Sequence, residues 1–462
     1  MNKRALIAIL VVMAMVTAAV PTTTPAAQAQ GGSLVFWSTE TQPERAAKTL
    51  EIIENFTAET GIEVNLVLTD ENTLDSLMAA NLAAGTLPDV VFHPVDFTAS
   101  WYAQGILDAE AATTVIEDLG EETFSALNLV GVEDGMYAAV PTDGWGQLLV
   151  YRADLFAEAG LEPPTTFELI ETAAAALNDP ENDFYGITSA TDESEVFMQQ
   201  TFEHFALANG VELTDDDGNV TLDTAAMAEA LDFYGNLLAN YGPPGACGVV
   251  CTRATYFAGQ AGMIVWSPFI LDEMAGLRDA ALPNCPECED NIAYLAENSG
   301  IVPAFVGPSG SEPAQYGQVS NMGISTTADT DAAIEFVEFW LSDGYLDWLS
   351  TSPEGKFPMH RGTPDEPTLY IDGWSQLETG VDRRAPLGDY YGEEVLQILI
   401  EGATGFNRWG FAKGQGQLVS GVYSELPVPT LLRDVLDGNL DGAGAASEIQ
   451  IWVEDIQAAL EE

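Results

Sequence analysis

The stretch Tyr137-Ala-Ala-Val-Pro-Thr-Asp-Gly-Trp-Gly-Gln-Leu-Leu-Val-Tyr-Arg-Ala-Asp-Leu-Phe156 decides how we interpret this chain. It contains a polar segment, residues 142–147, between two apolar pieces. Pro141 fixes one backbone dihedral, and glycines flank Trp145 on both sides. This pattern predicts a bendable loop that carries a hydrogen-bond acceptor, Asp143, and a flat apolar face, Trp145. Taken alone, it favours a loop with a core tryptophan.

The residues before this stretch predict a parallel sheet. Short apolar or alternating runs, typical of strands, are separated by two patterns with one apolar helical face. The strands are expected at 34–37, 62–68 and 90–92, and the second helix at 73–84. A β-α-β-α-β order implies a parallel sheet with helices on both faces. Ligands of such sheets sit beyond the carboxyl ends of the strands, here residues 38–42 and 93–96.

The residues after the stretch continue the α/β pattern. Residues 167–240 are mainly helical in character, and further strands are expected at 301–306 and 321–326. An amphipathic helix is predicted over 331–342. No internal repeat and no low-complexity segment interrupts the pattern.

Several segments resemble the extracellular solute-binding proteins of ABC transporters, in particular the maltose-binding-protein-like, sugar-binding group. They occur in the family's order: Phe36-Trp-Ser-Thr-Glu-Thr41, Gly61-Ile-Glu-Val-Asn65, Ala84-Gly-Thr-Leu-Pro-Asp-Val-Val-Phe92, Leu155-Phe-Ala-Glu-Ala-Gly-Leu-Glu-Pro-Pro-Thr-Thr166 and Phe257-Ala-Gly-Gln-Ala-Gly-Met263. The resemblance implies an α/β, two-lobed periplasmic-binding-protein type II fold with an interlobe ligand cleft and several hinge crossings. We expect one lobe at 33–142 plus 303–327, and the other at 143–302 plus 328–462.

The same resemblance implies candidate ligand-binding residues. They are Glu40, Thr41, His93, Asp96, Asp143, Trp145, Trp266, Phe269, Arg408 and Trp409. Polar side chains of these types pair with hydroxyl groups, and an aromatic plane covers the C–H face of a sugar ring. His93 stands where some relatives carry a stacking aromatic residue. The segment Trp266-Ser-Pro-Phe269 leaves two candidates for one stacking position. Trp101, Trp340 and Trp348 are expected to be packing residues.

These residues predict a receptor that binds a neutral sugar, with a di- or oligosaccharide favoured. It would act as a monomer and deliver the sugar to a membrane permease and its ATPase. Two alternatives remain open: a receptor for a cationic solute such as a polyamine, and a secreted glycoside hydrolase. The chain has no Gly-x-Ser-x-Gly, His-Glu-x-x-His or phosphate-loop motif, and its three histidines are not spaced as a metal site. We therefore expect no enzyme activity, no metal and no cofactor.

The amino terminus and the charge balance predict an exported protein. Residues 1–30 have a basic start, an apolar stretch and the small-x-small sequence Ala27-Gln-Ala29, which is typical of a signal peptide. No cysteine follows it, so a lipoprotein is not expected. The chain has 14 Lys and Arg against 72 Asp and Glu. Nucleic acids and anionic membranes are therefore excluded as partners. Such dispersed acids suit high salt, and a saline source is our hypothesis.

Four cysteines form two close pairs, Cys247 with Cys251 and Cys285 with Cys288 along the sequence. Export favours disulfides over zinc. Four cysteines allow three connectivities, and the sequence does not choose among them.

Overall fold

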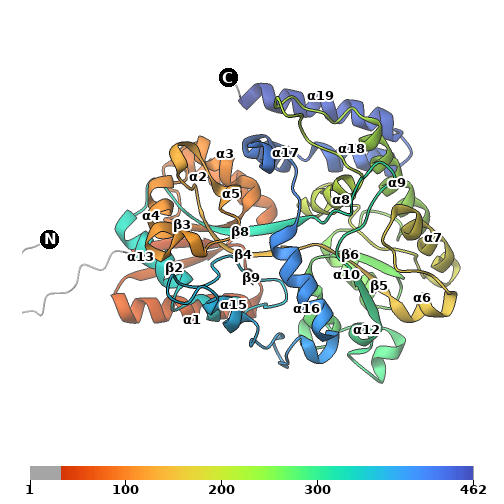
Figure 1. Cartoon of the computed structure of the whole chain (residues 1–462), viewed down its shortest axis with the longest axis horizontal. Coiled ribbons are helices and arrows are strands. Elements are labelled where there is room, and N and C mark those ends of the chain that lie inside the picture. The colour runs from red at the N-terminus through yellow and green to blue at the C-terminus, as the bar shows by residue number, and fades with distance from the viewer. Residues whose placement is uncertain (1–32, 461–462) are drawn as a thin grey trace, which may run out of the picture.

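The computed structural model describes residues 33–460 and contains two α/β lobes (Figure 1). The expected signal peptide, residues 1–30, lies outside the described residues. Each lobe has its own sheet. The first has six strands in the order β2-β1-β3-β8-β4-β9, and the second has three in the order β6-β5-β7.

The first sheet begins with the parallel unit that the sequence predicts. Strands β1 (Ser33–Ser38), β2 (Glu63–Leu68) and β3 (Val90–Pro94) pair in parallel. They are connected by α1 (Pro43–Thr60) and α2 (Glu71–Ala84). Both helices end at a glycine in the left-handed conformation, Gly61 and Gly85, which only glycine adopts without strain. The expected β-α-β-α-β order is confirmed.

Two long antiparallel strands complete the first sheet. Strand β8 (Gly317–Ile324) pairs with β3 on one side and with β4 (Val140–Gly146) on the other. The expected loop at 142–147 is therefore wrong, because almost all of that segment belongs to β4. Pairing with β8 and β9 (Phe357–Pro358) satisfies its backbone, and a register shift between Pro141 and Asp143 accommodates the proline.

The two lobes are joined at several places. One residue, Gln147, separates β4 in the first sheet from β5 (Leu148–Arg152) in the second. Strand β5 pairs with β6 (Met263–Trp266) and β7 (Ser299–Val302), and the chain returns to the first sheet through β8. Helix α16 (Gly388–Gly405) packs along β4 and β8 and also meets the second-lobe helix α12 (Tyr294–Glu297) (Figure 1).

The remaining helices surround the sheets. The first lobe also contains α3 (Thr98–Ala103), α4 (Ala109–Leu119) and α5 (Leu127–Val130). The second lobe contains α6 (Ala153–Ala159), α7 (Phe167–Leu177), α8 (Val196–Ala208), α9 (Ala225–Tyr241), α10 (Val249–Phe257) and α11 (Leu271–Met274). At the carboxyl end, α18 (Pro427–Leu436) and α19 (Gly442–Leu460) pack on α9, and α17 (Gly416–Glu425) packs between α3 and α19.

The expected division of the lobes is wrong for residues 330–374. Helix α13 (Thr330–Leu341) packs on α4 and β8, and α14 (Tyr345–Leu349) packs on α1. Strand β9 and α15 (Leu369–Trp374) follow them in the first lobe. The amphipathic pattern of α13 identifies a helix but not the sheet that covers its apolar face.

Trp101, Trp340 and Trp348 are fully buried, as expected of packing residues. Trp340 and Trp348 lie in the first lobe with their ring centroids 5.2 Å apart. Trp101 donates its indole N–H to Asp75 at 2.7 Å. The first-lobe core therefore rests on aromatic side chains whose polar atoms, in two of the three cases, are paired.

The cysteines are joined within each close pair, Cys247 to Cys251 and Cys285 to Cys288. The first pair stands at the start of α10, and the second lies in the segment before α12. This pairing selects one of the three connectivities that the sequence left open.

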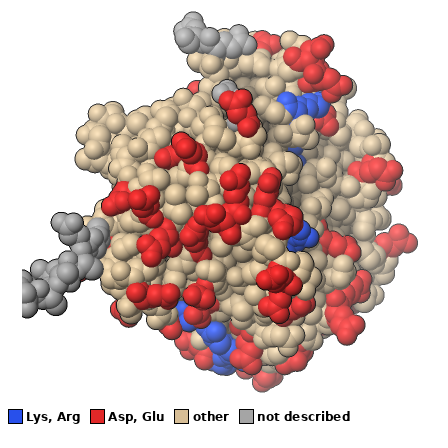
Figure 2. Space-filling model, turned by 60° about the vertical axis from the view of Figure 1, so that its left-hand side comes forward, with Lys and Arg blue, Asp and Glu red and all other residues tan. Residues whose placement is uncertain are grey.

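Acidic side chains are scattered among uncharged residues over the surface shown in Figure 2, and basic side chains are few there. The acids are spread over many elements, as the sequence suggests, and do not form a tail. None of the helices in residues 33–460 is long and apolar enough to cross a membrane.

The glycines beside Trp145 serve close packing. A methyl group at Gly146 would lie 2.5 Å from Nε2 of Gln315 and 2.8 Å from Cα of Gly402. One at Gly144 would lie 3.1 Å from the Gln318 carbonyl oxygen. Our interpretation of these glycines as sources of backbone freedom is therefore wrong, since both lie in a paired strand that neighbours approach closely.

We expect Gly146→Ala to lower the free energy of unfolding by about 1–3 kcal/mol, because the added methyl group has no space. Urea denaturation measures this effect. Gly405→Ala at the end of α16 is the control, because nothing lies within 4 Å of the position of its methyl group. Equal urea midpoints for both variants would contradict the packing explanation.

Candidate functional site

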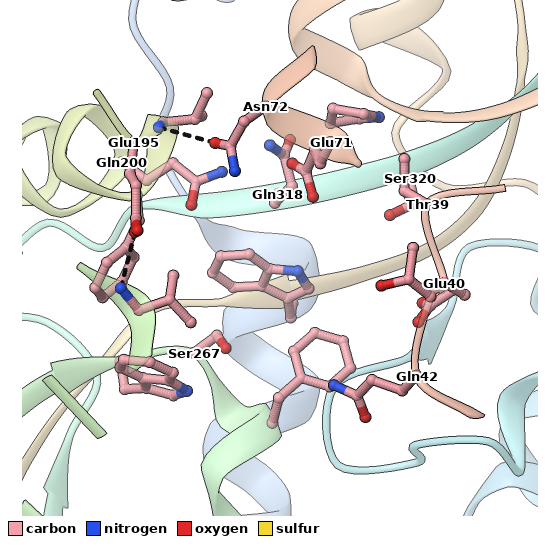
Figure 3. A pocket seen from close by; sticks show the side chains of 18 of the residues that line it. Thr39, Glu40, Gln42, Glu71, Asn72, Glu195, Gln200, Ser267, Gln318 and Ser320 are labelled. Carbon is pink, nitrogen blue, oxygen red and sulfur yellow. Dashed lines mark hydrogen bonds between the residues drawn. The ribbon is translucent and has the colours of Figure 1, made fainter. Parts of the chain in front are cut away.

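A cleft of about 330 Å³ lies between the two lobes (Figure 3). The first lobe lines it with residues that directly follow the carboxyl ends of its parallel strands. Residues 39–42 follow β1, Glu71 and Asn72 follow β2, and Pro94 ends β3. This is the edge at which parallel sheets place their ligands.

The second lobe faces these loops with side chains from three elements. Glu195, Gln200 and Arg253 come from the region of α8 and α10, and Ser267 follows β6. Among the lining residues, Asn72 Oδ1 of the first lobe accepts a hydrogen bond from the backbone N–H of Val196 in the second lobe at 3.4 Å. The cleft is therefore bounded by polar groups of both lobes.

Aromatic side chains of both lobes line the cleft: Phe92, Trp145, Phe197, Trp266 and Phe269. Trp145 is partly exposed, and its ring forms an edge-to-face pair with Phe269 of the second lobe, with centroids 6.4 Å apart. Trp266 is 7% exposed and packs edge-on against Phe197 at 4.9 Å. Both candidates in the Trp266–Phe269 segment thus reach the cleft, and Phe269 is the more exposed of the two.

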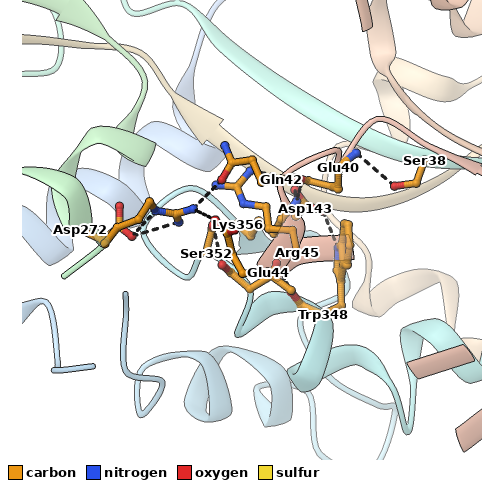
Figure 4. A network of polar contacts seen from close by, with 12 residues as sticks. Ser38, Glu40, Gln42, Glu44, Arg45, Asp143, Asp272, Trp348, Ser352 and Lys356 are labelled. Carbon is orange, nitrogen blue, oxygen red and sulfur yellow. Dashed lines mark hydrogen bonds and ion pairs between the residues drawn. The ribbon is translucent and has the colours of Figure 1, made fainter. Parts of the chain in front are cut away.

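A buried lysine organises the floor of the cleft (Figure 4). Lys356 Nζ lies 2.5 Å from Glu40 Oε1, 3.5 Å from Asp143 Oδ1 and 4.0 Å from the ring centroid of Trp348. Arg45 pairs with the other oxygen of Glu40 at 2.8 Å. Lys356 is 1% exposed, so its charge is neutralised almost entirely by these neighbours.

The surroundings at the floor shift the pKa values of its two carboxylates, Glu40 and Asp143, in opposite directions. Burial acts to raise the pKa of Glu40, but Arg45 and Lys356 outweigh it and lower this pKa to about 2. Burial raises the pKa of Asp143, and Lys356 and the Trp348 indole N–H oppose that rise. Trp348 Nε1 donates to Asp143 at 2.8 Å.

Asp143 therefore does not have the predicted position. It is 1% exposed, its hydrogen bonds go to Trp348 and Thr142, and it does not line the cleft. Asp143 and Trp145 are two residues apart on β4 and therefore lie on the same face of the strand. Asp143 is buried because Trp348 and Lys356 contact it there, whereas Trp145 stays partly exposed to the cleft.

Asp96, Arg408 and Trp409 belong to a second buried cluster, behind the lining residue Gln318. The Arg408 guanidinium donates to Asp96 and, at 3.2 Å, to Glu203 of α8. Gln318 Nε2 donates to the other Asp96 oxygen at 2.5 Å. Trp409 donates its indole N–H to the backbone carbonyl of Val211 at 3.0 Å and is 2% exposed. None of the three predicted residues lines the cleft.

His93 is also placed away from the cleft. It is fully buried, with its ring centroid 4.8 Å from that of Trp101, and burial lowers its pKa to about 4. The imidazole is therefore neutral at pH 7. It projects from β3 into the core against Trp101 and does not face the cleft. Of the predicted residues, the cleft lining contains Glu40, Thr41, Trp145, Trp266 and Phe269.

Several lining residues escaped the sequence interpretation. Glu71 and Asn72 could have been found, because they follow β2 just as residues 39–42 follow β1. Desolvation in the cleft, together with the nearby carboxylates of Asp96 and Glu40, raises the pKa of Glu71 to about 7. Gln200, Arg253 and Lys356 carry no such signal, since only the tertiary fold brings their elements to this place.

Chemically, the cleft offers donors, acceptors and apolar faces. Amide, hydroxyl and carboxylate groups surround the aromatic rings, an arrangement that pairs with hydroxyl groups on one side and C–H faces on the other. No group of three or more His, Cys, Asp or Glu side chains within residues 33–460 is arranged to hold a metal ion.

Similar proteins share this architecture. A family model described as bacterial extracellular solute-binding protein matches residues 39–346. The Escherichia coli (strain K12) protein YcjN, named as an ABC transporter periplasmic-binding protein, is 30% identical over 403 residues. That match covers 85% of this chain and 87% of YcjN.

Two solved structures extend the likeness to the whole fold. The GacH receptor of Streptomyces glaucescens GLA.O has a TM-score of 0.71 at 17% identity, covering 92% of this chain and 98% of GacH. Maltose-bound MalE3 of T. maritima has a TM-score of 0.70 at 18% identity, covering 92% of this chain and 100% of MalE3. The expected two-lobed type II fold is confirmed.

We expect Lys356→Met to lower the free energy of unfolding at pH 7 by about 3 kcal/mol, because Glu40 and Asp143 lose a buried cation. The depressed pKa of Glu40 means that its favourable contribution is present above its usual value of 4.5 and is lost as the pH falls through about 2. The penalty of the variant should therefore shrink as the pH falls from 7 toward 3, where Asp143, left without its cation, takes up a proton while Glu40 keeps Arg45 as a partner.

Urea denaturation at pH 7 and pH 4 measures this difference. Lys413→Met is the control, because Lys413 pairs with the exposed side chains of Glu212 and Asp216. Its effect should stay below about 1 kcal/mol. A Lys356→Met penalty that is small, or that does not change with pH, would contradict the assigned pairing.

Proposed function

Because this chain belongs to the bacterial extracellular solute-binding proteins, we propose that it is the receptor of an ABC importer and binds a neutral sugar between its lobes. The observation that carries the proposal is the lining of the cleft, where Trp145, Trp266 and Phe269 stand among amide and hydroxyl groups. Such a site discriminates strongly, since a wrong ligand leaves its polar groups unpaired. GacH has been solved with acarbose, and MalE3 with maltose.

The size of the cleft favours a short sugar. Its volume of about 330 Å³ lies at the lower end of ordinary ligand sites. A ligand of one or two rings fits this space better than a long oligosaccharide. In this proposal, Trp145 and Phe269 cover ring faces, and Thr41, Glu71 and Asn72 contact hydroxyl groups. Asp96, Asp143 and Arg408 support the site from behind.

One observation favours a second candidate, a cationic solute such as a polyamine. Glu71 and Glu195 line the cleft on opposite lobes, and neither forms an ion pair with another residue in 33–460. A doubly charged ligand could bridge them. Desolvation and the carboxylates of Asp96 and Glu40 raise the pKa of Glu71 to about 7 in the cleft without ligand, and a bound cation would lower that pKa again.

A thermal-shift panel of neutral sugars, polyols, polyamines and phosphate esters tests the proposal. A ligand that binds only the folded protein raises its melting temperature. At a ligand concentration of a hundred times Kd, the free energy of unfolding rises by about 2.7 kcal/mol. We expect a response to mono- or disaccharides. A response to polyamines alone would replace the sugar proposal.

Oligosaccharides that stay intact on prolonged incubation would support binding without turnover, and released products would favour a glycoside hydrolase.

The remaining parts of the proposal concern the cell. We place the protein outside the cytoplasmic membrane after removal of residues 1–30, as a monomer without a lipid anchor. Its partners would be the permease and the ATPase of the importer. The family supports export and transport, and the acidic surface supports neither a nucleic-acid nor an anionic-membrane partner.

We expect Trp145→Ala to weaken sugar binding at least tenfold. A stacked ring contributes on the order of 1 kcal/mol beyond area burial, and about 1.4 kcal/mol is a decade in affinity. The melting temperature without ligand should change little, since the ring is partly exposed. Titration calorimetry and an apo melting curve measure both. Trp340→Ala, in the core, should show a large drop in melting temperature. The same pattern in Trp145→Ala would assign Trp145 to packing.

We also expect both disulfides in the exported protein. A thiol titration under denaturing conditions should find fewer than one free thiol per chain, because each pair has its Cα atoms about 5 Å apart, within disulfide range. Four titratable thiols, or bound zinc, would refute this.

A further inference from the structure

Arg278 of the second lobe contacts the first lobe at the rim of the cleft. It follows α11, and its side chain is 4% exposed. On its own lobe it donates to Asp272 Oδ2 from Nε at 3.2 Å and from Nη2 at 3.1 Å. Across the cleft, Nη1 donates to Gln42 Oε1 at 2.5 Å and to Glu44 Oε1. Figure 4 shows Asp272 on one side of this group and Gln42 with Glu44 on the other.

The two halves of this contact behave differently when the lobes move. Arg278 and Asp272 are only six residues apart on one lobe, so their pairing does not depend on closure. Gln42 and Glu44 stand at the start of α1, in the first lobe. Their contacts with Arg278 exist only while the lobes lie as they do here. An interaction present in one state alone shifts the equilibrium toward that state.

The contact also reaches the ligand space. Gln42 lines the cleft, whereas Arg278 does not. Because Arg278 occupies the Gln42 side-chain oxygen, the Gln42 amide is held with its NH₂ group available as a donor. A side chain fixed in this way loses less entropy on binding than a free one.

We propose that Arg278 is a positioning residue that couples closure of the lobes to ligand affinity. It holds the start of α1 through Glu44 and orients Gln42 toward the ligand, without touching the ligand itself. This inference rests on the proposed function, because it concerns the affinity for a ligand that binds between the lobes. It predicts that part of the affinity comes from a contact between the lobes, and that its loss speeds ligand release.

Glu44 is the residue to change first. Removing Arg278 would leave Asp272 buried without its cation and could prevent folding of the second lobe. Glu44 has a side chain 25% exposed, and its substitution leaves the Arg278–Asp272 pair intact. Glu44→Gln removes the attraction, and Glu44→Lys adds repulsion between the lobes.

The matched control is Glu51→Lys. Glu51 lies on the same helix, is 58% exposed, and pairs only with Lys48 among the described residues, on that helix. Its substitution changes the net charge of the protein by the same amount as Glu44→Lys. Any effect of total charge will therefore appear in both variants.

We expect Glu44→Gln to weaken binding of the sugar identified in the panel a few-fold, and Glu44→Lys at least tenfold. Most of the change should be a faster dissociation rate in stopped-flow measurements, since the lobes must break this contact when they separate to release the ligand. Glu51→Lys should bind within twofold of the unaltered protein. Apo melting temperatures of all three variants should agree within a few degrees.

Small-angle scattering separates this inference from the sugar proposal. At saturating ligand, Glu44→Lys should retain a larger radius of gyration than Glu51→Lys, whichever ligand the panel identifies. Equal affinity and dissociation rate in Glu44→Lys and Glu51→Lys would overturn the role of Arg278 and leave the function intact. A panel in which only polyamines bind would end the sugar proposal, and the two variants would then be compared with that ligand.

Discussion

The floor of the cleft depends on one buried ammonium group, that of Lys356. A buried cation must be neutralised by its neighbours, and here two carboxylates and one indole ring do so. These groups come from the loop after β1, from β4 and from α14. Because all of them must reach one atom, the three segments have fixed relative positions. The loop that carries Thr39 and Thr41 into the cleft is held by the same constraint.

Basic residues are used differently from acidic ones in this protein. The chain has only 14 Lys and Arg, yet Arg45, Arg152, Arg278, Lys356 and Arg408 are buried in ion pairs. Few are left for the surface, which is therefore dominated by acids (Figure 2). The scarce cations thus hold the cleft and the contacts between lobes, while the excess acids repel one another outside. Salt weakens that repulsion, which supports the hypothesis of a saline source.

The site has two layers with the same residue types. Glu40 lines the cleft, while Asp96 and Asp143 are buried behind it, although Glu40 and Asp96 both follow strand ends and Asp143 lies within β4. Glu40 and Asp143 share Lys356 as a partner, and Asp143 is buried by the additional contact with Trp348. Asp96 faces Arg408, and Asp143 faces Lys356 and Trp348, each more than 200 residues away along the chain. Whether an acidic side chain reaches the cleft is therefore decided by neighbours that lie far away along the sequence.

The sequence by itself determined the local elements and the general place of the site. The apolar or alternating runs of β1 to β3 and the apolar faces of α1 and α13 are patterns among residues close in sequence, so periodicity identifies these elements. The rule for parallel sheets then located Glu40 and Thr41 at the cleft. The family resemblance, carried by short motifs in order, supplied the two-lobed fold and the aromatic candidates.

Only the tertiary structure decided which side chains face the cleft. The pairing of β4 with β8 turned a predicted loop into a strand. Trp348 and Lys356 then bury Asp143, while Trp145, two residues further along the same face, lines the cleft. Residues 330–374 joined the first lobe because the apolar face of α13 meets α4 and β8 there. Lys356 and Arg278 came into place through contacts that span hundreds of residues. Burial and ion pairing are properties of the folded neighbourhood, and a single sequence does not contain that neighbourhood.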